Sequence, residues 1–192
     1  MSDKLFRTFI AVPVPDRVKT LKQMLFSTLE SEKSKIKWVR NMQIHLTLKF
    51  LGYTPDTSVK GLKLVIASVI ARYETFNLTI SDTGCFPSPT RPRVLWLGVN
   101  GETNQLVSMV DELEKVLDVE GFPKADRPFV PHITLARIRY PQKYTPNISP
   151  YLQSSYDQIA LPVNRVQFFS SELLPDGAVH TLLGTFPLGK IF

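Results

Sequence analysis

The feature that most constrains this chain is a short motif, His-x-Thr-Leu, that occurs twice. The first copy lies in the apolar run 43–52 and the second in the run 129–137. Side chains two residues apart in a strand point to the same face of a sheet, so each copy places an imidazole and a hydroxyl together. The apolar residues between them point to the other face, where they can pack in a core. The two sets are His45 and Thr47 with Ile44, Leu46, Leu48 and Phe50, and His132 and Thr134 with Ile133 and Leu135.

The third histidine, His180, provides an internal comparison. It lacks the motif because Thr181 and Leu182 follow it directly. Two of three histidines in the full motif is a coincidence with odds on the order of a few in ten thousand if composition alone placed them. His45 and His132 are 87 residues apart, which indicates an internal duplication.

The composition is that of an ordinary globular protein. The chain has 192 residues, of which 43% are hydrophobic and 21% charged. This length favours one domain over residues 1–192, built here from two pseudo-symmetric lobes. The formal net charge of +6 suits a polyanionic partner such as nucleic acid or a phosphorylated metabolite, or a basic surface kept for solubility.

Cysteine usage and the N-terminus bear on location and metal binding. A single cysteine, Cys85, excludes an intramolecular disulfide and a cysteine-rich zinc site. The N-terminus lacks the apolar region of a signal peptide, and no apolar run is long enough to span a membrane, so we expect a cytoplasmic protein without a membrane anchor. Zinc binding by His45 and His132 would require a third ligand, and no cluster of usable spacing supplies one.

Hydrophobic periodicity predicts strands and helices without a glycine-rich phosphate loop or regular βαβ order. Amphipathic helices are expected over residues 16–30, 59–73 and 102–119. Strands are expected over 4–14, 36–39, 43–52, 76–80, 93–99, 129–137, 165–172 and 179–186, with a hairpin turn at Pro175-Asp176-Gly177. This order favours an α+β fold of two similar lobes, with two mainly antiparallel sheets, outer helices and a central groove lined by the motif strands.

Two imidazoles that face one groove can act as an acid–base pair. Near neutral pH, one can accept a proton while the other donates one. Phosphodiester cleavage needs both, because the attacking oxygen loses a proton and the departing oxygen gains one. The threonine hydroxyls can donate hydrogen bonds to phosphate oxygens. Lys49, which strand alternation places on the His45 face, or Arg137 could add positive charge.

Four blocks of sequence carry a family resemblance that covers nearly the whole chain, from residue 4 to about residue 186. They are Phe9-Ile10-Ala11-Val12, His45-Leu46-Thr47-Leu48-Lys49-Phe50-Leu51-Gly52, Val94-Leu95-Trp96-Leu97-Gly98 and Arg127-Pro128-Phe129-Val130-Pro131-His132-Ile133-Thr134-Leu135-Ala136-Arg137. In this order they resemble the 2H phosphoesterases. Within that superfamily they are most similar to the RNA 2′,3′-cyclic phosphodiesterases, also called LigT-like or 2′-5′ RNA ligase-like proteins.

The resemblance implies a metal-independent enzyme without a cofactor that opens a terminal 2′,3′-cyclic phosphate of RNA to a 2′-phosphomonoester. By this analogy His45 is the proton donor to the departing 3′ oxygen and His132 accepts a proton from water. Thr47 and Thr134 would hold the phosphate. Arg137 matches a phosphate-contacting position, but strand alternation places it opposite His132, so a bulge or strand end must bring it into the groove.

The implied partner is RNA with a 2′,3′-cyclic phosphate terminus, tRNA fragments being one candidate, and we expect a monomer that does not bind membranes. Phe129, Trp38 and Lys49 are possible contacts to a base or to RNA. The two aromatic residues lie near the motif strands and could stack on a base, although packing in a core is the commoner role of large aromatic residues. A basic run before the first motif could guide an RNA tail or form a solvated face: Lys33, Lys35, Lys37 and Arg40.

Three other functions stay open. The substrate could be a small cyclic nucleotide or ADP-ribose cyclic phosphate, or the protein could catalyse reversible 2′-5′ RNA ligation. A non-catalytic RNA-binding module is the third, and the two intact motifs argue against it. Formation of a 2′- rather than a 3′-phosphate rests on the resemblance alone.

Overall fold

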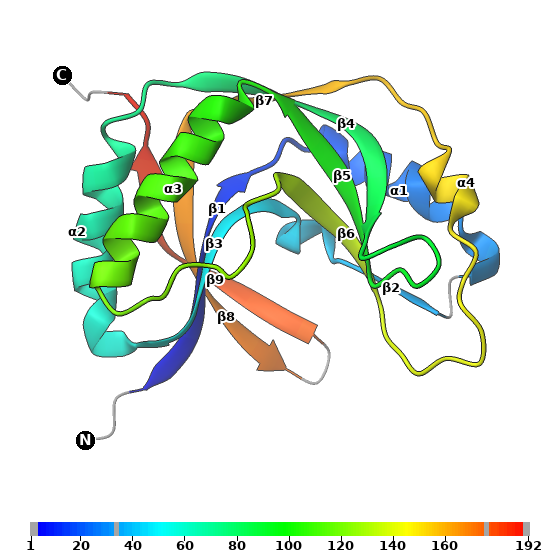
Figure 1. Cartoon of the computed structure of the whole chain (residues 1–192), viewed down its shortest axis with the longest axis horizontal. Helices are drawn as coiled ribbons and strands as arrows, with labels where there is room; N and C mark the ends of the chain where they lie inside the picture. Colours follow the sequence, from blue (N-terminus) through cyan, green and yellow to red (C-terminus); the bar gives the residue numbers. More distant parts are fainter. Residues whose placement is uncertain (1–3, 33–34, 175–176, 190–192) are drawn as a thin grey trace.

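An antiparallel sheet of nine strands runs through the described part of the protein (Figure 1). The structure, a computed structural model, describes residues 4–32, 35–174 and 177–189. The strands are β1 (Leu5–Pro13), β2 (Ile36–Trp38), β3 (His45–Pro55), β4 (Phe76–Phe86), β5 (Val94–Gly101), β6 (His132–Ile138), β7 (Ile159–Val163), β8 (Arg165–Leu174) and β9 (Gly177–Pro187). Their order in the sheet is β7-β4-β5-β6-β3-β1-β8-β9, and β2 pairs with the C-terminal half of β6.

Helices cover the two halves of the sheet in pairs (Figure 1). α2 (Val59–Ile70) and α3 (Thr103–Val119) pack on each other and contact β9 and β3. α1 (Arg17–Ser27) and α4 (Ser149–Leu152) lie on the other half, where Phe26 and Tyr151 both contact Trp38 of β2. Short 3₁₀ turns are η1 (Glu30–Glu32), η2 (Asn41–Gln43) and η3 (Asp56–Ser58). Each long helix buries one apolar stripe, in α3 formed by Leu106, Met109, Val110, Leu113 and Leu117.

The two halves of the sheet meet at one residue pair. β1, β3, β8 and β9 form one half, and β2, β4, β5, β6 and β7 form the other. The register between β3 and β6 consists of Leu46 opposite Ile133, and both side chains are fully buried. The predicted α+β fold with antiparallel strands and outer helices is confirmed, and the two predicted sheets are continuous through this pair, which we call the junction pair.

A β-bulge follows each His-x-Thr motif. On β3 the register against β1 skips Leu48, and on β6 the register against β5 skips Leu135. One extra residue on one strand reverses the alternation of faces beyond it. Leu48 and the residue after it are therefore both buried, as are Leu135 and Ala136. Further along, Phe50 and Arg137 turn to the face of the motif histidines, where they are exposed.

The remaining predicted elements agree with the structure to within a few residues at most ends. β4 extends to Phe86, beyond the predicted end, and neither β7 nor α4 was predicted. β7 contains Pro162, which disfavours an interior strand but is tolerated here because β7 is at the edge of the sheet. β8 and β9 form the predicted hairpin, whereas residues 175–176 of its turn lie outside the described residues.

The bulge on β3 also reverses the faces that were predicted for two residues. Lys49 does not lie on the His45 face but is buried beneath the sheet, 4% exposed, and forms an ion pair with Glu114 of α3. Its ammonium also donates to the Pro123 carbonyl at 2.8 Å. Phe50, predicted to be in the core, is 64% exposed. The buried ion pair connects β3 to α3 and to the segment that leads into β6.

We expect Glu114→Ala to lower the free energy of unfolding by about 3–5 kcal/mol, because it leaves the Lys49 ammonium buried without a counter-ion. Urea unfolding measures the change. Lys49→Met with Glu114→Ala should recover most of the loss, since an apolar side chain needs no counter-ion. Asp16→Ala, in the exposed pair with Lys19, is the matched control and should cost less than about 1 kcal/mol. Equal effects of the two single variants would contradict this assignment.

Candidate active site

His45 and His132 stand at the starts of the two central strands, β3 and β6. Because the junction pair next to them is buried on the core side, the motif side chains point to the opposite face. The antiparallel register brings His45 toward Thr134 and His132 toward Thr47. All four side chains are half-buried. Two imidazoles and two hydroxyls are thus gathered at the centre of the sheet.

His45 lies in a cluster of aromatic and imidazole rings. It stacks on Phe9, with ring centroids 4.7 Å apart and planes inclined by 20°. Phe9 in turn stacks on Phe169 at 5.2 Å. His180 of β9 lies edge-on to both, 5.7 Å from His45 and 4.9 Å from Phe9. These rings hold the His45 imidazole in one orientation and exclude water from its faces.

The pKa of His45 is lowered from 6.5 to about 4. Burial is the main cause, because it disfavours the charged imidazolium, and the nearby charges of His180 and Arg137 lower the pKa in the same direction. A hydrogen bond to the backbone of Gln43 opposes them. Burial also lowers the pKa of His180. Without substrate, His45 is therefore neutral at pH 7.

His132 is held by a hydrogen bond and by different aromatic residues. Its Nδ1 lies 2.7 Å from the Val130 carbonyl oxygen. A carbonyl can only accept, so Nδ1 carries the hydrogen and, in the neutral ring, Nε2 has the lone pair. Phe86 and Trp96 contact the ring edge-on, at 5.1 and 6.4 Å. This tautomer allows Nε2 to accept a proton.

The position of the Trp96 ring beside His132 depends on a glycine, Gly84. A Cβ atom on Gly84 would lie 2.2 Å from the indole ring of Trp96, far inside van der Waals contact. Glycine therefore allows the indole to lie flat against β4, next to Phe86. The structure thus places Trp96 against the His132 ring.

Arg137 reaches the site through the bulge at Leu135. The sequence alone required such a bulge, and the register shift on β6 confirms it. The positive charge of Arg137 is one of the causes that lower the pKa of His45, so the guanidinium is close enough to act on the ring. The arrangement can therefore combine two imidazoles, two hydroxyls and one cation around a single anionic group.

Comparisons with known proteins show the family to which the chain belongs. A family model described as the 2′-5′ RNA ligase superfamily matches residues 13–173. The chain belongs to this superfamily. It is 32% identical over 178 residues to an RNA 2′,3′-cyclic phosphodiesterase of Thermotoga maritima, a match that covers 92% of each chain. The predicted family resemblance is thereby confirmed.

Solved structures support the same fold. A Thermus thermophilus protein superposes with a TM-score of 0.79 and 28% identity, over 95% of this chain and 97% of that one. Escherichia coli LigT complexed with 3′-AMP superposes with a TM-score of 0.75 and 24% identity, over 96% and 99% of the two chains. The LigT-like architecture predicted from the sequence is therefore confirmed.

Two of the three residues predicted to contact RNA do not face the histidines of this superfamily member. Trp38 is wrong as a base contact, because its ring packs between Phe26 and Tyr151, 5.6 and 6.4 Å away. Lys49 is wrong for the reason given above, since the bulge turns it into the core. Phe129 is half-buried and packs against the core, so a contact with a base stays a prediction.

His180 is a site residue that sequence reasoning missed. β9 is three strands away from β3 in the sheet, yet the sheet curls enough to bring His180 against His45. The Gln43 side-chain amide donates to the Ala178 carbonyl, which holds the start of β9 beside the segment before β3. Nδ1 of His180 is buried and has no hydrogen-bond partner within the described residues. No local pattern could have indicated this position, because it depends on the curl.

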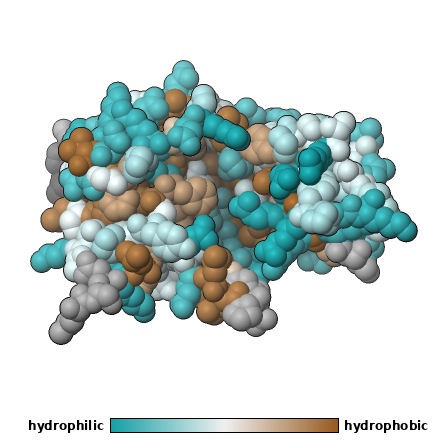
Figure 2. Space-filling view, turned by 60° about the horizontal axis from the view of Figure 1, so that its bottom comes forward, coloured by the Kyte–Doolittle hydropathy of each residue, from teal (hydrophilic) through white to brown (hydrophobic). Residues whose placement is uncertain are grey.

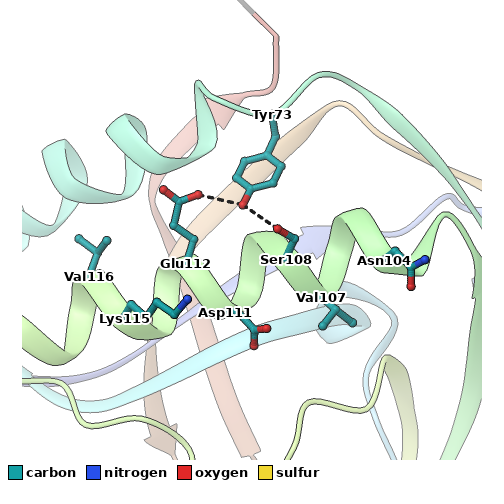
Figure 3. Close-up of a pocket in the computed structure, with 8 residues that line it drawn as sticks. All are labelled: Tyr73, Asn104, Val107, Ser108, Asp111, Glu112, Lys115 and Val116. Atoms are coloured by element: carbon teal, nitrogen blue, oxygen red, sulfur yellow. Dashed lines mark hydrogen bonds between the residues drawn. The ribbon is translucent and has the colours of Figure 1, made fainter.

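Two hollows differ in their relation to the site. One, of about 570 Å³, is lined by residues of β2 and β6 and includes Arg137. The other, of about 700 Å³, lies along the outer side of α3 (Figure 3). There the Tyr73 hydroxyl donates to Glu112 at 2.8 Å and lies 3.4 Å from the Ser108 hydroxyl. Neither hollow is lined by a motif histidine, but the basic one includes Arg137 and so adjoins the candidate site.

We also searched the structure for metal ligands, membrane-spanning helices and a reactive thiol. In residues 4–32, 35–174 and 177–189, no three His, Cys, Asp or Glu side chains gather as a protein metal site requires. None of the helices in those ranges is both long and apolar enough to cross a bilayer. Burial raises the pKa of the Cys85 thiol, which disfavours the nucleophilic thiolate.

Replacing His180 by glutamine is expected to raise the pKa of His45 above about 4, because a positive charge beside the ring is lost. His45 would then become charged at a higher pH than in the wild type, as NMR titration of its ring would show. Phe9→Ala should raise the pKa further, since burial is the main cause. Thr181→Ala, next to His180 but exposed, should leave it unchanged. A His45 pKa that is the same in all three variants would contradict this account.

Proposed function

We propose that this protein hydrolyses 2′,3′-cyclic phosphate ends of RNA to 2′-phosphomonoesters, without a metal, by a two-histidine acid–base mechanism. The observation that carries the proposal is the junction pair, which brings two His-x-Thr strands side by side with their histidines on one face. The activity named for the Thermotoga maritima relative supports it. Phosphodiester hydrolysis needs one group that accepts a proton and one that donates a proton, and the site has an imidazole for each.

In the proposed reaction, His132 accepts a proton at Nε2 from the attacking water. The water oxygen forms a bond to phosphorus while the bond from phosphorus to the 3′ oxygen breaks. His45 donates a proton to that departing oxygen, and the product keeps its phosphate on the 2′ oxygen. The hydrogen bond between His132 Nδ1 and the Val130 carbonyl supports this direction, because it leaves Nε2 to accept.

The low pKa of His45 is compatible with a donor role once substrate is bound. His45 is neutral in the unliganded protein, but the negative charge of a cyclic phosphate beside it would favour the imidazolium. As the bond from phosphorus to the 3′ oxygen breaks, that oxygen becomes strongly basic, so the imidazolium can transfer its proton to it. Substrate binding would therefore charge His45 and prepare it to donate.

Thr47, Thr134 and Arg137 would hold the phosphate. A hydroxyl on each side of the junction pair can donate a hydrogen bond to a non-bridging oxygen, where negative charge concentrates in the transition state. The guanidinium of Arg137 can add a charge-assisted hydrogen bond. All three lie on the same face as the histidines, so they can act on one phosphate together.

The natural partner in this proposal is processed RNA, with tRNA fragments as one candidate. The net charge of +6 supports a polyanionic substrate. We further propose a monomeric, cytoplasmic enzyme. The single cysteine, Cys85, supports the location alone, because a reducing compartment keeps thiols unpaired.

Purified protein, incubated with EDTA and a short RNA that ends in a 2′,3′-cyclic phosphate, should release a 2′-phosphomonoester. Phosphorus NMR and sensitivity to phosphatase identify the product. A 3′-phosphate would refute the proposed regiochemistry, and activity that EDTA abolishes would refute metal independence. Turnover of a cyclic mononucleotide or of ADP-ribose cyclic phosphate, without turnover of RNA, would favour the small-molecule alternative.

His45→Ala and His132→Ala should each lower kcat by about 10²–10⁴-fold, the usual contribution of one acid or base, while their unfolding transitions stay cooperative. A substrate with sulfur in place of the bridging 3′ oxygen separates the two roles, because a thiolate departs without needing a proton. It should restore much of the activity of His45→Ala and little of that of His132→Ala. The reverse pattern would exchange the two assignments, and full activity of either variant on the natural ester would exclude the mechanism.

A further inference from the structure

The pairing of β2 with β6 sorts the side chains of these strands by charge. The pairs are Ile36 with Ile138, Lys37 with Arg137, and Trp38 with Ala136. The apolar members are buried or half-buried on one face. Lys37 and Arg137 are exposed on the other face, which is the face of the motif histidines. By the same alternation, the cationic row continues one step beyond the strands, to Lys35 just before β2 and Arg139 just after β6.

This row lines the hollow of about 570 Å³ next to the site. Four of its lining residues are the basic side chains Lys35, Lys37, Arg137 and Arg139, and none of the lining residues that the structure describes is a carboxylate. The Gln142 side-chain amide donates to the carbonyls of Arg139 and Lys35, at 2.7 and 3.1 Å, and so fixes the outer end of the hollow. From below (Figure 2), hydrophilic residues gather over the right-hand half, which carries β2 and β6.

The charges of the row are largely available to a ligand. Lys35 is engaged, since it pairs with Glu32 and lies 3.8 Å above the Tyr144 ring. In the part of the chain that the structure describes, no carboxylate forms an ion pair with Lys37, Arg137 or Arg139. Like charges held this close repel one another unless an anion lies between them. The arrangement therefore favours a bound polyanion.

The row also begins at the candidate active site. Arg137 acts on His45 electrostatically, so a phosphate held there occupies the inner end of the row. Residues two apart on a strand are about 6.6 Å apart, a spacing close to that of successive phosphates in an extended nucleic-acid strand. A single cyclic nucleotide offers one phosphate and would leave Lys37 and Arg139 unused. A longer RNA has further phosphates that can follow the row.

We infer that the hollow along β2 and β6 binds the phosphodiester backbone of the nucleotides that precede the cyclic end, and that it makes an oligonucleotide a better substrate than a mononucleotide. This inference rests on the proposed function. It identifies Lys37 and Arg139 as determinants of substrate length, with Arg137 shared between this hollow and the reacting phosphate. Of the basic run noted in the sequence, Lys37 contributes its charge to binding the RNA backbone, whereas Lys35 already forms an ion pair with Glu32.

The test compares Lys37→Gln with Arg139→Gln, made together, against a matched control that removes two exposed charges on the outer helices, Lys60→Gln with Lys115→Gln. Substrates are an RNA oligonucleotide with a 2′,3′-cyclic end and a 2′,3′-cyclic mononucleotide. For the oligonucleotide, the first double variant should raise KM about tenfold, as expected for two lost ionic contacts, with kcat retained. The mononucleotide KM should change far less, and the control should resemble the wild type on both substrates.

Salt dependence gives a second measure. The slope of log affinity for the oligonucleotide against log salt concentration should decrease by about 1.4 in the first double variant, since each phosphate contact to a single strand contributes about 0.7. Fluorescence anisotropy measures this without turnover. An unchanged slope, or equal losses on both substrates, would overturn the inference and leave the proposed function intact. If the wild type hydrolyses neither substrate, the proposed function fails, and the binding slope still decides whether this hollow holds the backbone.

Discussion

The contact between Leu46 and Ile133 is the constraint on which the site depends. It is the point where the two halves of the sheet meet, and both side chains are fully buried. Each has a histidine before it and a threonine after it, so burial of the two apolar residues forces four polar side chains onto the opposite face. The hydrophobic effect thus positions the polar groups indirectly, through the alternation of the strand. Losing either apolar side chain would loosen the geometry of both motifs together.

The same bulge occurs after both motifs but has different consequences in the two halves. On β3 it buries a lysine, which α3 neutralises through Glu114, and exposes Phe50. On β6 it buries Ala136 and brings Arg137 to the site. The same backbone geometry therefore buries a cation in one half of the sheet and exposes a cation at the site in the other half. Positive charge is placed on one side of the groove, where the row along β2 and β6 extends it outward.

The two histidines also differ in their surroundings, although their motifs are alike. His45 lies among Phe9 and His180, and burial lowers its pKa to about 4. His132 is fixed through Nδ1 by the Val130 carbonyl and touched by Phe86 and Trp96 at its edge. The surroundings of the two imidazoles therefore differ, and the difference comes from neighbours that lie mostly on other strands. Two copies of one motif can in this way serve two roles.

The sequence by itself determined the two motif strands, the long helices, the α+β class and the family, because these depend on local periodicity and on short motifs. It also showed that Arg137 could act only if a bulge intervened. The tertiary structure decided that the bulge exists, that Lys49 is buried, that Trp38 packs under α1 and α4, and that His180 joins His45. A bulge reverses the faces of a strand without changing its hydrophobic pattern, and the curl of a sheet brings together strands that are distant in order. Neither effect is recorded in the spacing of residues along the chain.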